Sequence, residues 1–247
     1  MANAAAITLR ASSANAEAGD GDAVDLGATR NAVRLTLTFT AATGLARVFL
    51  ETSPDGSTGW RNVNLIGESG AAASFERWFI GLDRYVRVRW TVTTSATFGC
   101  EGEAYTVFAS RPDLAGRTAE TIIERAERKN ADATAMALVD ASSAAESEAI
   151  TAHPLPFTKW PSVFRRHVAS VSIYYLAVMG GAQGAGIDEL VVKNHDDAIA
   201  WFKRVGKRDA HMAGAEPESH PQVKLSSGNT DQPECYQPKF SDNWGDF

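Results

Sequence analysis

The sequence predicts an α+β protein with three parts: an antiparallel β-sandwich, a four-helix bundle and an extended C-terminal tail. Apolar and polar side chains alternate over residues 1–109, and the apolar period changes to 3.6 over residues 110–208. Residues 209–247 contain no periodic apolar run. A chain of 247 residues with 44% hydrophobic side chains is long enough to form two cores. These three ranges are therefore the predicted domains.

Alternation with a period of two predicts the strands of the first part. Val33, Leu35, Leu37 and Phe39 alternate with polar residues, which places four apolar side chains on one face of a strand. Comparable runs occupy residues 45–52, 60–66, 75–80, 86–93 and 103–108. Residues 53–57 predict a turn, because proline presets φ and glycine accepts a positive φ. Several short strands at this spacing are typical of a sandwich.

The outward face of this sandwich has two interpretations. Its rows of Arg and Thr are either a ligand-binding face or a solvated surface that discourages strand pairing with other chains. Trp60, Trp78 and Trp90 are either platforms that stack on sugars or packing residues. Because Trp90 is in phase with valines, we expect it in the core.

A period of 3.6 predicts four helices in the second part. The first covers residues 118–130, and the second covers 132–150 and is rich in alanine, which permits close helix–helix approach. The third begins at Pro161, a residue favoured in a first turn. The fourth follows the glycine-rich joint 180–186. One face of the third helix contains Phe164, Val168, Val171, Tyr175 and Val178, and one side of the fourth contains Leu190, Val191, Ala198, Trp201, Phe202 and Val205.

A bundle of this size is small, so we expect neighbouring subunits to complete some of its apolar faces. The side chains expected to serve helical packing or a subunit interface are Phe164, Val168, Val171, Tyr175, Trp201 and Phe202. His167 and His195 are expected at helix–helix or subunit contacts rather than at a metal site, because no zinc-binding spacing surrounds them.

The tail has the composition of a segment that does not fold alone, since it is rich in Pro, Ser, Gly and acidic residues. Four aromatic residues nevertheless gather at its end. Aromatic side chains are effective anchors because they bury a large area with few rotatable bonds. We therefore expect the tail to dock on a partner protein through Tyr236, Phe240, Trp244 and Phe247.

The charge distribution argues against sequence-specific DNA binding. Residues 1–109 have a net charge of −2, residues 110–208 of +1 and residues 209–247 of −5, which gives −6 in total. DNA affinity requires concentrated Lys and Arg, which no segment shows. The arginines of the helical part are candidates for contacts with an acidic partner or with DNA in a channel; among them are Arg117, Arg125, Arg128, Arg165 and Arg166.

No catalytic, cofactor or metal signature emerges from the sequence. The stretch 180–186 follows a helix and lacks the Lys-Ser/Thr of a phosphate loop. No nucleophile, base and oxyanion donor can be combined into a site, so we expect a protein that is not an enzyme and needs no cofactor. Two cysteines, no apolar run of membrane-spanning length and no secretion signal at Met1–Ala4 predict a protein of a reducing cytoplasm without a membrane.

Residues 110–247 resemble the Mu-like phage head–tail connector proteins, also called adaptor or head-completion proteins. Ser110–Leu114 is similar to the opening T-P-x-D-L of that family, and Asp140–Glu146 to its D-A-S-x-x-I-D stretch. His153–Pro156, followed by Pro161 and the third helix, resembles its Y-P-L-P…P core, with histidine in place of tyrosine. Asp197–Phe202 resembles its D-A-I-x-W-L helix, and Phe240–Phe247 its aromatic-ended tail.

This resemblance implies a structural protein of the virion neck, assembled in the cytoplasm of the bacterial host. Identical subunits, expected to number twelve, would form a ring beneath the portal protein, contact the next neck, stopper or tail protein, and let DNA pass without base contacts. The first 109 residues resemble β-sandwich modules of phage structural proteins at Thr52–Trp60 and Arg84–Trp90. Two alternatives remain: a carbohydrate- or surface-binding sandwich on an oligomerising helical base, and a tail-terminator ring.

Overall fold

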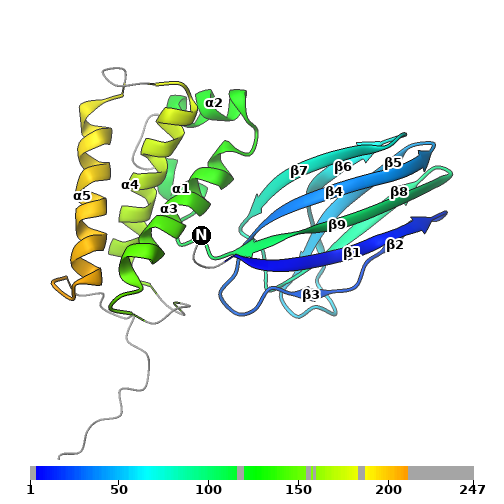
Figure 1. Ribbon diagram of the computed structural model, residues 1–247, viewed down its shortest axis with the longest axis horizontal. Coiled ribbons are helices and arrows are strands. Elements are labelled where there is room, and N and C mark those ends of the chain that lie inside the picture. Colours follow the sequence, from blue (N-terminus) through cyan, green and yellow to red (C-terminus); the bar gives the residue numbers. More distant parts are fainter. Residues whose placement is uncertain (1–3, 116–119, 154–156, 158–159, 183–186, 211–247) are drawn as a thin grey trace, which may run out of the picture. The chain divides into compact units, whose positions relative to one another are not determined.

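The structure is a computed structural model that describes residues 4–115, 120–153, 157, 160–182 and 187–210. Two antiparallel sheets face each other in the first half of the chain, as predicted (Figure 1). The first sheet has the strand order β1 (Ala5–Asn15), β9 (Ser95–Tyr105), β4 (Ala32–Thr43) and β7 (Ala73–Ile80). The second has the order β2 (Gly19–Asp20), β8 (Tyr85–Val92), β5 (Ala46–Ser53) and β6 (Arg61–Ser69), and β3 (Val24–Asp25) also pairs with β8.

The alternating apolar residues form the core between the sheets. Val33, Leu35, Leu37 and Phe39 of β4 are all buried, as are Val86, Val88 and Trp90 of β8. The predicted inward position of Trp90 is therefore confirmed. The edge strand β1 was not predicted, because its Ala and Ser residues give no clear alternation and two register shifts interrupt its pairing with β9.

The turn predicted at residues 53–57 is confirmed in its chemistry. Gly56 has a φ of 75°, and its backbone lies against the ring of Tyr85. The Asp55 carboxylate accepts hydrogen bonds from the backbone N–H groups of Ser57 and Thr58, at 2.9 and 2.8 Å. An aspartate that accepts hydrogen bonds from the next residues in this way closes a turn through local contacts.

Within the described residues, five helices follow the sandwich: α1 (Arg111–Ala115), α2 (Glu120–Lys129), α3 (Ala133–Ala149), α4 (Ser162–Met179) and α5 (Glu189–Gly206). The last four are those predicted from the sequence. Helix α1 was not predicted because five residues are too few to show a period of 3.6. Helix α4 contacts all four other helices and so occupies the centre of the bundle.

Two apolar residues were assigned to the wrong side of their helices. Val178 is 46% exposed and Leu190 is 62% exposed, although the periodic pattern placed both on core faces. Val178 lies in the last turn of α4 and Leu190 in the first turn of α5. At these terminal turns the neighbouring helices no longer cover a side chain that the period alone would place inward.

Helix α3 packs through a row of alanines. Ala133, Ala137, Ala141, Ala145 and Ala149 follow one another at intervals of four residues, and all five are fully buried. Residues four apart lie on one face of a helix, so the row forms a smooth ridge. The close approach predicted for this alanine-rich helix is consistent with that ridge, because an alanine side chain adds only one methyl group between two backbones.

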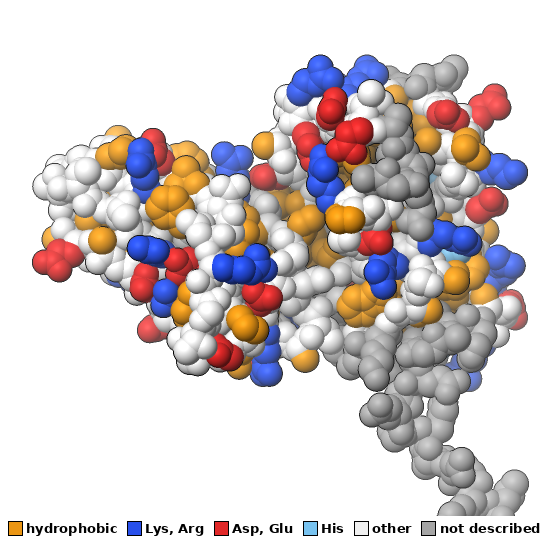
Figure 2. Space-filling model, turned by 180° about the vertical axis from the view of Figure 1, so that it is seen from behind, with side chains coloured by type: hydrophobic (Ala, Val, Ile, Leu, Met, Phe, Trp, Pro, Cys, Tyr) orange, Lys and Arg blue, Asp and Glu red, His pale blue; other side chains and the backbone are white. Residues whose placement is uncertain are grey.

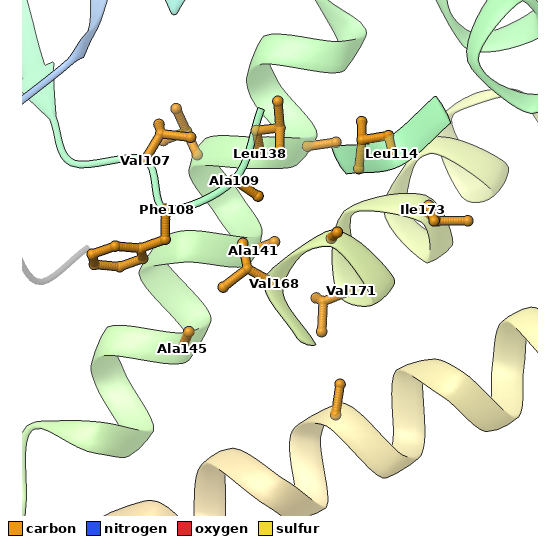
Figure 3. Packing of buried hydrophobic residues seen from close by; sticks show 14 of the residues in the cluster. Val107, Phe108, Ala109, Leu114, Leu138, Ala141, Ala145, Val168, Val171 and Ile173 are labelled. Atoms are coloured by element: carbon orange, nitrogen blue, oxygen red, sulfur yellow. The ribbon is translucent and has the colours of Figure 1, made fainter. Parts of the chain in front are cut away.

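The connection between sandwich and bundle differs from the prediction. Strand β9 ends at Tyr105, so the run predicted as a strand over 103–108 leaves the sheet after that residue. Residues 106–109 are instead buried in the helical core, where Val107, Phe108 and Ala109 lie close to α3 and α4 (Figure 3). The alternation of polar and apolar residues continues beyond the end of β9. The apolar side chains after Tyr105 pack in the helical core and not in the sandwich.

No helix within the described residues is long and apolar enough to cross a membrane.

Cys100 supplies a simple test of the sandwich core. Its thiol is fully buried on β9, and burial raises its pKa to about 12. A thiol reacts as the thiolate, so we expect native protein at pH 7.5 to take up one iodoacetamide label, on Cys235. Mass spectrometry should show two labels once urea has unfolded the chain. Labelling of Cys100 in the native protein would contradict this packing.

Candidate functional site

The antiparallel helices α4 and α5 hold most of the residues expected at a packing or subunit interface. Phe164, Val168, Val171 and Phe202 are completely buried within the chain's own bundle. Tyr175 and Trp201 are only partly buried. The first four side chains are thus occupied by packing inside one subunit, and only the last two have surface left for a second subunit.

Two ring stacks join α4 to α5 and account for both histidines. His167 stacks on Trp201 with ring centroids 4.6 Å apart, and Tyr174 stacks on His195 at 4.2 Å. The expected position of these histidines at helix–helix contacts is confirmed. Burial and then the nearby Asp140 carboxylate raise the pKa of Tyr175 above its ordinary value.

Beyond the exposed Arg165 and Arg166, the solvent-facing side of α4 carries no charge. Between His167 and Met179 the sequence contains no Asp, Glu, Lys or Arg. Val178 is nevertheless exposed, and Tyr174 is partly so. Solvent-facing positions of a surface helix usually bear charges. This uncharged side is therefore a candidate contact surface.

Four of the five arginines proposed as contact residues lie on the surface: Arg125, Arg128, Arg165 and Arg166 are exposed, and Arg117 lies outside the described residues. On α2, the arginines alternate with the exposed acids Glu120 and Glu124. Figure 2 likewise shows basic and acidic side chains interspersed over one face of the molecule. Such a surface provides individual cationic contacts rather than a continuous basic track.

The clearest cavity adjoins the buried connection. It has a volume of about 420 Å³ and is lined by Asn31, Val107, Phe108, Ala109, Ser110, Asp113, Trp160 and Arg165. We call it the junction pocket. One part of its lining is apolar, formed chiefly by Phe108 and Trp160, whose ring centroids are 4.9 Å apart. The remainder is polar, and among the lining residues that the structure describes Arg165 is the one Lys or Arg.

Hydrogen bonds hold the walls of the junction pocket in place. The indole N–H of Trp160 donates to the carbonyl of Phe108 at 3.1 Å. The side-chain amide of Asn31 both donates to the carbonyl of Val107 and accepts from its N–H, at 3.0 and 2.8 Å. These bonds fix the backbone on which the pocket is built. A binding site is usually such a preformed concavity with an apolar lining and a few polar groups.

The electrostatics of the pocket centre on Arg165. The carboxylate of Asp113 accepts hydrogen bonds from the backbone N–H and the hydroxyl of Ser110, at 2.8 and 2.7 Å. The guanidinium of Arg165 approaches that carboxylate only to 4.0 Å, the limit for an ion pair. Because its side chain is also 47% exposed, Arg165 retains donors that can meet a carboxylate from another segment.

Sequence reasoning missed this pocket. Its lining comes from Asn31, from the connection after β9 and from the start of α4, segments that are far apart along the chain. The alternation over 103–108 predicted a strand, and therefore did not show that Val107 and Phe108 leave the sheet and line a pocket. A proline-flanked Trp160 just before a helix was the one feature that pointed to this region, since a tryptophan outside the periodic pattern often packs at a junction.

The three tryptophans of the sandwich do not form one platform. Trp90 is buried, and Trp78 stacks on Tyr105 at 5.5 Å. Trp60 is partly exposed, and the guanidinium of Arg87 lies 4.3 Å from its ring. Arg87 also pairs with the buried carboxylate of Glu51 at 2.8 Å. Arg87 is thus held between an aromatic ring and a carboxylate, an arrangement that satisfies it within the chain.

In the described part of the chain, no three His, Cys, Asp or Glu side chains are grouped closely enough to hold a metal ion. The four aromatic residues expected to anchor the tail, Tyr236, Phe240, Trp244 and Phe247, lie outside the described residues.

The helical part lies within a stretch that matches a known protein family. Residues 109–227 match the family model described as Bacteriophage Mu, Gp36. This match covers just under half of the chain and contains α1 to α5, together with Trp160 and Arg165. The helical part of the chain is therefore similar to a family of bacteriophage proteins. The sandwich strands and residues 228–247 lie outside the Gp36 match. A search of curated proteins finds none that matches the chain.

Proposed function

We propose that this chain is a structural virion protein, a head–tail adaptor that forms a ring beneath the portal and leads to the tail. The observation that carries this proposal is the match of the helical part to the Bacteriophage Mu, Gp36 family. The connector role itself comes from the resemblance of residues 110–247 to Mu-like connector proteins. In this role the protein is not an enzyme and acts in the neck of the virion.

Self-assembly into a ring, with twelve subunits as the proposed number, is supported by the surface of the bundle. The uncharged side of α4 and the partly exposed Tyr175 and Trp201 offer apolar area without a charge to desolvate. Obligate oligomers use interfaces of this composition. DNA would pass through the ring without sequence-specific contacts, which suits a helical part whose arginines are interspersed with acids.

The tail gives the proposal its most direct test. We expect the chain to co-sediment with portal-containing heads, and expect loss of residues 232–247 to abolish this while the fold remains intact. The tail has the composition of a segment that does not fold alone, so we expect the described cores to form without the deleted residues. Replacing Tyr236, Phe240, Trp244 and Phe247 by serine should reduce co-sedimentation at least about tenfold, since each aromatic anchor contributes about 1–2 kcal/mol or more.

The matched control replaces the polar tail residues Gln232, Gln237, Ser241 and Asn243 by alanine, which should leave co-sedimentation unchanged. Undiminished co-sedimentation of the serine variant would remove the docking role of the tail. Recovery of the protein with isolated tails instead of tailless heads would favour a tail-terminator ring. The carbohydrate-binding alternative has less support, because no two of Trp60, Trp78 and Trp90 share an exposed platform.

A further inference from the structure

We infer that the junction pocket receives the aromatic end of the tail, residues 240–247, from a second copy of this chain. The inference deepens the proposed function and rests on it in one respect, since it requires two copies side by side. The sequence predicts a docking tail but not the surface that binds it, and the junction pocket is the surface that we assign. Three features of the molecule support it: the chemistry of the pocket, the place where the described chain ends, and the length of the segment between.

The chemistries of pocket and segment complement each other. The pocket combines the partly exposed ring of Trp160 with the exposed guanidinium of Arg165. Residues 240–247 read FSDNWGDF, with three aromatic residues, two aspartates and neither lysine nor arginine. An aromatic ring can lie against the Trp160 side of the pocket while a neighbouring aspartate meets Arg165 at the rim. A volume of about 420 Å³ is in the range of pockets that accept such groups.

The end of the described chain lies at the pocket's end of the bundle. The stacks of His167 on Trp201 and of Tyr174 on His195 show that α4 and α5 run antiparallel. The end of α5 therefore lies beside the beginning of α4, which supplies Arg165 to the pocket. A hydrogen bond at 2.7 Å from the hydroxyl of Thr151 to the carbonyl of Gly206 fixes this end of α5 against the end of α3.

The length of the intervening segment favours a second copy over the same chain. Residues 211–239 separate Ala210 from Phe240, which is 29 residues. Their composition predicts a coil, and a coil of that length has an end-to-end distance of about 30 Å. This is about the width of a domain of a hundred residues. Returning to the pocket of the same bundle would need far fewer residues, because the described chain ends at the pocket's end of the bundle, whereas a coil of about 30 Å is long enough to reach an adjacent copy.

The experiment uses the full chain and its own cysteines. Because Cys100 is buried, a maleimide fluorophore at neutral pH should label Cys235, five residues before Phe240. We expect the anisotropy of the label to rise with protein concentration as tails dock. Arg165→Glu should raise the concentration of half-maximal anisotropy about tenfold, because it replaces attraction to Asp242 and Asp246 by repulsion. Melting curves check that each variant is folded.

Arg166→Glu is the matched control. Arg166 is the adjacent residue and is equally exposed, but it does not line the pocket. We expect its half-maximal concentration to stay within about twofold of the unaltered chain, since long-range charge effects are screened. If Arg165→Glu and Arg166→Glu raised the concentration of half-maximal anisotropy equally, general charge attraction would explain the effect, and docking in the junction pocket would be overturned. If the anisotropy of the unaltered chain did not rise with protein concentration, the proposed docking would be overturned as well.

Complementation between two altered chains decides whether docking occurs between copies. One chain is labelled and carries Arg165→Glu, so its tail is intact and its pocket altered. The other is unlabelled and carries Phe240→Ser, Trp244→Ser and Phe247→Ser, so only its pocket is intact. Mixing should restore the anisotropy if a tail reaches the pocket of another copy; an unchanged signal would overturn this. Co-sedimentation of the unaltered chain with portal-containing heads tests the adaptor role independently of all these outcomes.

Discussion

The Phe108→Ala variant is expected to lose about 3–5 kcal/mol of its free energy of unfolding, the usual loss for a fully buried phenylalanine. Phe108 lies after the last strand, yet its ring meets three others in the helical core. Centroid distances are 4.9 Å to Trp160, 5.0 Å to Phe164 and 5.8 Å to Phe157. Truncation leaves a cavity between α3 and α4 and removes one wall of the junction pocket. Urea unfolding followed by circular dichroism measures the loss.

Phe49→Ala is the control for this variant. Phe49 lies on β5 and is only partly buried, so its truncation should lower the free energy of unfolding much less.

Fragments of the chain provide an independent check of the role of residues 107–109. A fragment that starts at residue 110 lacks Val107, Phe108 and Ala109, whereas one that starts at residue 104 retains them. The longer fragment should be clearly more stable, and equal stabilities would show that the connection is dispensable for the helical core.

Ala141→Leu is expected to destabilise the bundle by about 1–3 kcal/mol, because three extra carbon atoms must enter a closely packed contact. Ala141 is the third member of the alanine row on α3 and lies opposite Val168 of α4 (Figure 3). Packing at this density leaves no space for a leucine side chain unless the two helices move apart. The midpoint of thermal unfolding measures the effect, and any displacement of α4 would also change the ring contacts between α4 and α5.

Ala144→Leu separates overpacking from any effect of leucine on the helix itself. Ala144 lies on the same helix but is partly exposed and outside the alanine row. Leucine is nearly as good a helix former as alanine, so this change should shift the free energy of unfolding by less than about 0.5 kcal/mol. If both variants were equally stable, α3 would not pack through its alanines as the structure indicates.

Much of the fold was accessible from local patterns. Alternation identified β4 and β8, and a period of 3.6 identified α2 to α5, because each element must bury one face. The side chains of Phe164, Val168, Val171 and Phe202 lie where that period placed them. Val178 and Leu190 do not, since a period describes the direction of a side chain and not whether another helix extends far enough to cover it.

The candidate site was less accessible. The sequence pointed to exposed arginines on the bundle, but it did not distinguish Arg165, which lines a cavity, from Arg166, which does not. A pocket is a property of segments that meet in space. Asn31 lies 77 residues before Phe108, and Trp160 lies 52 residues after it, so no local pattern records that they meet.

By itself, the sequence determined the two kinds of secondary structure, the point at which one gives way to the other, and the aromatic and acidic character of the tail. These follow from the order of side chains along the chain, since periodicity and composition are one-dimensional. Only the tertiary structure decided that residues 106–109 belong to the helical core and that a pocket opens beside them. The reason is physical: burial and cavities depend on which distant segments pack together. The apolar side chains of a segment such as 103–108 are compatible with either core, and only the packing shows which core buries them.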